Sequence, residues 1–118
     1  MGNTHRPTTG PFTAVQKSVL MGLVQGKSQR EIAKETGVRE SYVSAELAIA
    51  RQKLNCSTTA HAVSTMATAL AYREAADVLE ADVPRLRRND DHVDEHVAHV
   101  LLDLAKILRD RAAALLPE

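Results

Sequence analysis

The apolar residues at the start of the chain recur at helical spacing. They follow Thr13, a residue type that favours the N-cap of a helix, and they stop at Gly26, a residue type that favours helix ends. The set consists of Val15, Val19, Leu20 and Leu23. This spacing of three and four positions predicts a first helix between Thr13 and Gly26.

A second, shorter helix is predicted next. Ser28 and Glu31 have the spacing of a capping box, in which each side chain bonds the free backbone N–H of the other residue. Ile32 and Ala33 are expected to face inward, and Gly37 to provide a left-handed C-cap. Two short helices around a tight glycine turn are typical of a helix-turn-helix, which presents a helix to the DNA major groove.

A third helix is expected from about Glu40 to Leu54. One of its faces is apolar and is expected to be buried: Val43, Leu47, Ala50 and Leu54. The opposite face carries Ser41, Ser44, Ala45, Ala48 and Gln52.

Two longer helices are expected in the second half, which makes the predicted fold class all-α. A fourth helix begins near Thr58, its apolar pattern reaches Leu79, and a break is expected at Pro84 and the charged stretch 85–91. The last helix, about 91–115, has the most regular stripe: Val93, Val97, Val100, Leu104, Leu108 and Leu115. Such a stripe needs a partner helix, either segment 58–83 or a second copy of the chain.

Composition and charge agree with packed helices. Hydrophobic residues make up 44% and aromatic residues only 3% of the 118 residues, so the core must be built from Ala, Leu, Val and Ile. Residues 1–60 contain 8 Lys/Arg and 4 Asp/Glu, whereas residues 61–118 contain 7 and 11. This asymmetry fits a nucleic-acid module followed by a partner-binding module, although ordinary surface variation also produces such a split.

Several classes of protein are not expected. No apolar run approaches the ~20 residues of a membrane span. The N-terminus lacks an apolar signal core, and the lone Cys56 cannot form an internal disulfide, so a cytoplasmic protein is expected. There is no phosphate-binding loop, dinucleotide fingerprint or nucleophile elbow, so neither an enzyme nor a bound cofactor is expected.

The last helix also carries a strip of possible metal ligands: His92, His96, His99 and Asp103. One straight helix does not easily surround a metal, and no second cluster completes the site, so no metal is expected. Two other interpretations stay open, a dimer contact that responds to pH and a plain polar flank.

The N-terminal half resembles the LuxR-type (GerE-like) DNA-binding domain. The resemblance covers about residues 12–68 and is carried by Phe12-Thr13, Val19-Leu20, Gln25–Ser28, Glu31–Ala33, Gly37-Val38, Val43, Leu47 and Lys53-Leu54. Thr58-x-x-x-Ala62-Val63 resembles the fourth helix of that family. The resemblance implies a four-helix domain whose third helix enters the major groove and whose fourth helix makes a two-fold dimer contact.

The resemblance also implies site residues, with departures from the family pattern. The base-reading positions fall on Ser41, Ser44, Ala45 and Ala48. None of these is charged, so the bidentate guanine contact that needs Arg or Lys is excluded there. Glu46 stands where the family often has His, and Arg39 replaces the usual Ser or Thr cap. The cations near this surface, which are phosphate contacts or plain surface charges, are Lys27, Arg30, Lys34, Arg39, Arg51 and Lys53.

The expected organisation is a flexible tail (1–11), a helix-turn-helix domain (12–69) and a two-helix dimerisation extension (70–118). The expected dimer interface comprises Val63, Met66, Leu70, Val93, Val97, Val100, Leu104 and Leu108. The function expected is sequence-specific binding of double-stranded DNA by a homodimer that regulates transcription. Two alternatives stay open, a protein-interaction module with a partner on 70–118 and an architectural DNA binder without sequence preference.

Overall fold

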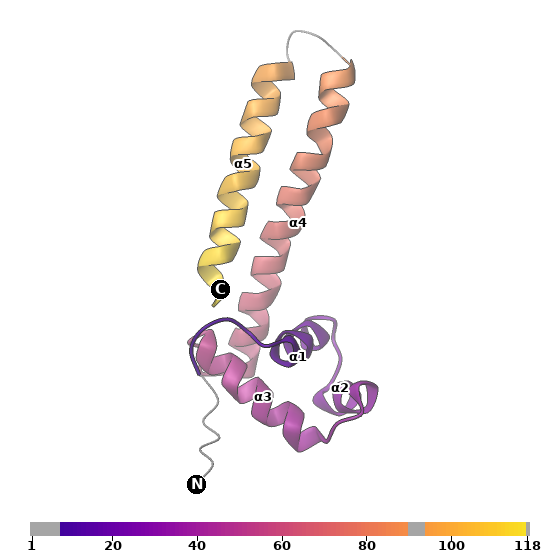
Figure 1. The fold of residues 1–118 in the computed structure, drawn as a ribbon, viewed down its shortest axis with the longest axis vertical. Helices are drawn as coiled ribbons and strands as arrows, with labels where there is room; N and C mark the ends of the chain where they lie inside the picture. Colours follow the sequence, from indigo (N-terminus) through magenta and orange to yellow (C-terminus); the bar gives the residue numbers. More distant parts are fainter. Residues whose placement is uncertain (1–7, 90–93, 118) are drawn as a thin grey trace. The chain divides into compact units, whose positions relative to one another are not determined.

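The computed structural model describes residues 8–89 and 94–117, and these residues form helices and no strand. The elements are α1 (Ala14–Val24), α2 (Gln29–Thr36), α3 (Glu40–Lys53), α4 (Thr59–Asn89) and α5 (Asp94–Leu115) (Figure 1). The all-α prediction is therefore confirmed. Within the described ranges, no helix has the length and apolar character needed to cross a membrane.

The chain divides into two compact units, and the division falls inside α4. The first unit reaches Ala67 and also includes Leu116, and the second spans Thr68–Leu115. The fourth helix of the N-terminal unit is therefore continuous with the first helix of the C-terminal unit.

Helix α1 begins where its sequence predicts. The Thr13 hydroxyl accepts from the Gln16 backbone N–H at 3.2 Å, and Gln16 Oε1 accepts from the Thr13 N–H at 3.0 Å. This second capping box satisfies two backbone donors that a helix start otherwise leaves unpaired. The helix ends at Val24, two residues before Gly26, whose φ of 89° lies in the left-handed region.

Helix α2 has the predicted signals at both ends. The Ser28 hydroxyl and the Glu31 carboxylate each accept the other residue's backbone N–H at 3.1 Å. The bond from the Ser28 N–H favours the ionised carboxylate and so lowers the pKa of Glu31 below its ordinary value. Gly37 is the C-cap and adopts φ 72°, a left-handed backbone conformation that residues with a Cβ rarely adopt.

Three short helices enclose the core of the first unit. Helix α3 packs against both α1 and α2. Its inner residues Val43, Leu47 and Ala50 are at most 3% exposed. Helices α1 and α2 also approach closely, because a Cβ built on Gly22 would lie 2.8 Å from two side-chain carbons of Ile32. Glycine is therefore the residue that allows this contact.

The expected break is wrong at Pro84, although the helix does end within the charged stretch 85–91. Helix α4 continues through Pro84 to Asn89. A proline inside a helix removes one backbone hydrogen bond and costs roughly 3 kcal/mol. Val83 is 3% exposed and Leu86 is half-buried, so the residues on both sides of the proline are held by packing. Tertiary burial supplies most of a helix's stability in a protein and here outweighs the local preference.

The second unit is built on a seam of alanines. Helices α4 and α5 run antiparallel and side by side in it (Figure 1). Buried residues recur every seven positions on both helices: Ala69, Ala76 and Val83 on α4, and Ala98, Ala105 and Ala112 on α5. Larger half-buried residues follow each of these by three positions: Tyr72, Leu79, Leu86, Leu101, Leu108 and Leu115. The seven-residue repeat is that of a coiled coil, and the small side chains allow the helix axes to approach closely.

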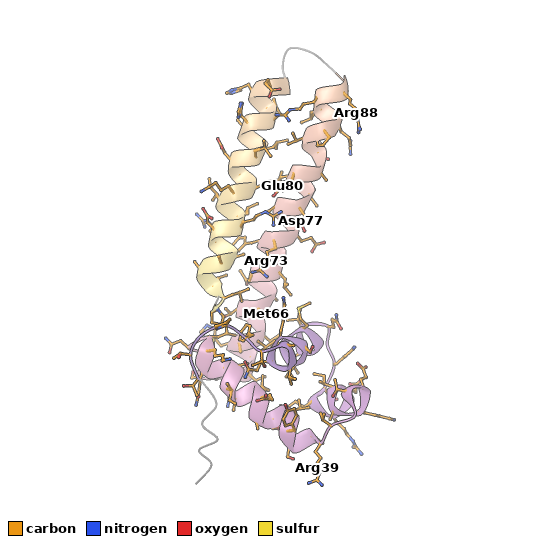
Figure 2. All side chains as sticks on the ribbon, in the orientation of Figure 1. Arg39, Met66, Arg73, Asp77, Glu80 and Arg88 are labelled. Carbon is orange, nitrogen blue, oxygen red and sulfur yellow. The ribbon has the colours of Figure 1, made fainter. Side chains whose placement is uncertain are left out.

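Ion pairs fix the register of the two antiparallel helices. The Arg109 guanidinium on α5 bonds Asp77 at 2.6 Å and Glu80 at 2.6 Å on α4, and Figure 2 labels both carboxylates. These bonds raise the pKa of Arg109. Arg87 pairs with Glu95 at 2.9 Å. Exposed pairs of this kind add little net stability, so their main consequence is to favour one alignment of the seam.

Replacing a seam alanine with leucine should destabilise the second unit. Ala105 is 1% exposed, so Ala105→Leu forces extra volume between two closely packed helices. Overpacking of this kind costs about 1–3 kcal/mol. Urea unfolding followed by circular dichroism measures the change. Ala113→Leu is the matched control, because Ala113 is exposed on the same helix and its replacement should leave stability nearly unchanged. Equal effects of the two substitutions would contradict the alanine seam.

Candidate nucleic-acid interface

The outer face of α3 is a small, uncharged surface. Ser41, Ser44 and Ala45 are exposed and Ala48 is half-buried. They lie on the side of the helix opposite the buried Val43, Leu47 and Ala50. The structure thus brings the four expected base-reading residues onto one accessible helix face. We call this set, Ser41, Ser44, Ala45 and Ala48, the reading face.

A hydrogen bond joins the reading face to α2. The Ser44 hydroxyl donates to Gln29 Oε1 at 2.6 Å. Gln29 is the first residue of α2, directly after the Ser28 cap, and it is half-buried. Gln29 was not predicted as a site residue from the sequence. Its position at the start of the first helix of the helix-turn-helix was the only available signal, and that signal does not reveal the bond to Ser44.

The expected phosphate-contacting cations fall into two groups. Arg30, Lys34 and Arg39 are exposed, and within residues 8–89 and 94–117 they make no ion pair. Arg39 is the N-cap residue of α3, makes no side-chain cap bond and projects from the end of that helix (Figure 2). The loss of a capping side chain, expected from the sequence, is therefore confirmed, and the guanidinium is accessible to a ligand.

The remaining cations are engaged within the domain or partly covered. Lys27 pairs with Glu35 at 2.8 Å. Arg51 is half-buried, and its buried Nε has no hydrogen-bond partner among the described residues. Lys53 is also half-buried, and its ammonium donates to the Pro11 carbonyl at 2.8 Å and to Gln16 Oε1 at 2.6 Å. These three cations are less accessible than Arg30 and Arg39.

Lys53 and Gln16 form a polar contact inside the first unit. Gln16 is 2% exposed, and its Oε1 accepts both the Lys53 ammonium and the Thr13 N–H. The same lysine holds the chain at Pro11. Lys53 therefore ties the end of α3 to the start of α1, a role that the sequence analysis did not foresee.

Of the two acidic residues of α3, Glu40 is exposed in the first turn and Glu46 is buried. Glu46 is 4% exposed, and its Oε1 lies 3.5 Å from the Tyr42 hydroxyl. A carboxylate on the reading face would repel phosphates, but this one lies on the buried side of the helix. The departure from the family pattern noted in the sequence therefore leaves the reading face neutral.

The residues expected at a dimer interface differ in exposure. Val100 and Leu104 on α5 are each 43% exposed, and the neighbouring Ile107 is 49% exposed. Met66 is completely buried, so it offers no surface to a partner. The half-buried members are Val63, Leu70, Val97 and Leu108. Val93 lies outside the described residues.

The histidine strip of the sequence lies on the exposed side of α5 where it is described. His96, His99 and Asp103 are exposed, whereas His92 falls outside the described residues. No group of three or more His, Cys, Asp or Glu side chains within the described ranges is placed to hold a metal ion.

Comparison with known proteins finds one family match, and it lies in the first unit. Residues 11–66 match the family model of bacterial regulatory proteins, luxR family. The matched range runs from just before α1 into the first turns of α4, so it contains the capping boxes, the glycine turn and the reading face. No curated protein and no solved structure matches the chain.

Replacing Lys53 should lower the stability of the domain, independently of any effect on ligand binding. Lys53→Met removes the donor to Gln16 Oε1 and to the Pro11 carbonyl while keeping the aliphatic length. Gln16 Oε1 keeps the bond from the Thr13 N–H but loses its charged donor, and a hydrogen bond to a charged group contributes about 1.5–3 kcal/mol. Thermal unfolding by calorimetry measures the loss. Lys34→Met, at an exposed position of α2, serves as the control and should melt like the unmodified protein. Unchanged stability in Lys53→Met would mean that the lysine's bonds are not structural.

Proposed function

We propose that this protein is a homodimeric, sequence-specific regulator of transcription, because residues 11–66 match the family model of bacterial regulatory proteins, luxR family. The observation that carries the proposal is the reading face. It is exposed, lies on the second helix of the helix-turn-helix and has the exposed Arg39 at its leading end.

The chemistry of the reading face suits contact with base edges in the major groove. The methyl groups of Ala45 and Ala48 can pack against thymine methyls, and the hydroxyls of Ser41 and Ser44 can hydrogen-bond base edges. Phosphates are contacted by the surrounding cations: Lys27, Arg30, Arg39, Arg51 and Lys53. Among these, Arg30 and Arg39 are the most accessible, whereas Lys53 would have to exchange its internal bonds for a phosphate.

The homodimer is proposed to form through the exposed apolar stripe of α5, which comprises Val100, Leu104 and Ile107, with the half-buried Val97 at its edge. The spacing of three and four positions places these residues along one side of the helix. The alanine seam occupies a neighbouring side of the helix, and Val100, Leu104 and Ile107 stay 43–49% exposed in the second unit. A contiguous apolar patch of this kind marks an interaction site. In a two-fold dimer, two reading faces would contact half-sites about one helical turn apart.

One observation favours a second function, a protein-interaction module. The reading face has no cation, and two of the expected phosphate contacts, Lys27 and Lys53, are engaged within the chain. An uncharged helix face and the α5 stripe would then both bind protein surfaces. This alternative predicts no binding of DNA that depends on salt.

Selection of bound duplexes from a random DNA pool tests the main proposal. The enriched sequence should be a palindrome, and its affinity measured by fluorescence anisotropy should fall steeply with salt. If each protomer contacts four phosphates, the slope of log affinity against log salt is about −3.6 per protomer. Arg39→Ala should weaken binding to all sequences. It should also reduce the magnitude of the salt slope by about 0.9, the value for one phosphate contact.

The control removes one positive charge elsewhere. Lys106→Ala changes an exposed lysine of α5 that pairs with Asp110, and it should leave DNA affinity nearly unchanged. An absence of both enrichment and salt dependence would overturn the proposal in favour of the protein-interaction module.

A charge placed in the α5 stripe should separate the dimer. Leu104→Lys puts an ammonium at the centre of the exposed stripe, where burial of an unpaired charge would be strongly unfavourable. Sedimentation velocity should show a monomer, and affinity for the palindrome should fall. Val78→Lys is the control, because Val78 is 56% exposed on the α4 surface away from the seam. A dimer that survives Leu104→Lys would place the interface elsewhere.

A further inference from the structure

We propose that Gln29 fixes the base preference of Ser44 by holding its hydroxyl hydrogen. A serine hydroxyl has one hydrogen to donate and two lone pairs that accept. The Ser44 hydrogen is directed to Gln29 Oε1 at 2.6 Å, which is a short distance for such a bond. The oxygen of Ser44 is therefore presented to the groove as an acceptor only. This inference rests on the proposed function, since it assigns a specificity to one residue of the reading face.

An acceptor-only Ser44 oxygen prefers some of the four bases over others. In the major groove, adenine N6 and cytosine N4 carry hydrogens to donate, whereas guanine and thymine present acceptors such as O6, N7 and O4. An acceptor-only oxygen can bond the amino groups of adenine or cytosine and is opposed by guanine O6 and thymine O4. A serine that rotates without restraint does not make this distinction, because it can bond either base type.

The residues around Ser44 make its bond to Gln29 important for base preference. The neighbouring Ala45 and Ala48 have no side-chain polar atom, so they contribute no competing hydrogen bond. Ser41 is exposed, and among the described residues its hydroxyl has no partner to orient it. Ser44 is therefore the one hydroxyl of the reading face whose hydrogen is held in the described structure.

Gln29 is suited to this role by its place in the fold. As the first residue of α2 it follows the Ser28–Glu31 capping box, which fixes the start of that helix. Ser44 lies in the middle of α3, whose inner face is fully packed. Both ends of the bond are therefore attached to rigid elements. The Gln29 amide nitrogen keeps two hydrogens, which can bond a phosphate or a base without releasing Ser44.

The test measures base preference at the contacted position. Each position of the duplex enriched by the unmodified protein is changed to all four bases in turn. The position contacted by Ser44 is the one at which the base preference disappears in the Ser44→Ala variant. At that position the unmodified protein should favour adenine or cytosine by about fivefold, the value of one ordinary hydrogen bond. Anisotropy titrations give the ratios.

Three variants at Gln29 then change the partner of the hydroxyl. Gln29→Met keeps the length but removes the acceptor, so the preference should fall to within about twofold. Gln29→Glu keeps an acceptor, so the preference should persist although overall affinity weakens near phosphates. Gln29→Lys donates to the serine oxygen and releases its hydrogen, so the preference should move to guanine or thymine. Arg30→Met is the control, since it should weaken all four duplexes equally.

The outcomes separate this inference from the proposed function. If the unmodified protein enriches a sequence but Gln29→Met leaves the preference unchanged, the inference is overturned and the proposed function stands. Loss of the preference in Gln29→Glu would also overturn the inference, because the carboxylate still accepts from Ser44. If the unmodified protein enriches no sequence, the proposed function itself fails. Circular dichroism melting checks that each variant is folded.

Discussion

The packing of α3 against α1 and α2 is the interaction on which the rest of the first unit depends. Its inner side chains Val43, Leu47 and Ala50 are almost completely removed from solvent. Because a helix turns about 100° per residue, burial of these positions decides which others face outward. Ser41, Ser44 and Ala45 are exposed as a direct consequence, and Glu46 is carried to the covered side. The chemistry offered to a ligand therefore follows from the core.

Polar contacts with definite geometry then set the orientation of the helices that the core brings together. The two capping boxes fix where α1 and α2 begin. Lys53 connects the last turn of α3 to Gln16 and Pro11, and Ser44 connects its middle to Gln29. A helix restrained at both places presents its side chains with little freedom. This restraint matters because base recognition depends on the direction of each donor and acceptor.

The sequence was most reliable where a local signal had one structural meaning. The Ser28–Glu31 box, the left-handed Gly37 and the apolar spacing of α3 all have the predicted structure. Pro84 misled the prediction because its local cost is smaller than the stability gained by burying Val83 and the residues around it. The bond between Ser44 and Gln29 joins residues 15 positions apart, and the bond between Lys53 and Gln16 joins residues 37 positions apart. No local sequence pattern encodes such contacts.

The alanine seam explains why Val100 and Leu104 in the apolar stripe of α5 are exposed, whereas Leu108 and Leu115 are half-buried. The sequence pattern predicted that Val97, Val100 and Leu104 contact a partner helix, which would be either segment 58–83 or a helix of a second copy of the chain. Inside the second unit, the closest contact is made instead by Ala98, Ala105 and Ala112, because small residues permit a shorter distance between helices. Ion pairs at Arg109 favour the same register. Once the seam is occupied by alanines, Val100 and Leu104 stay exposed.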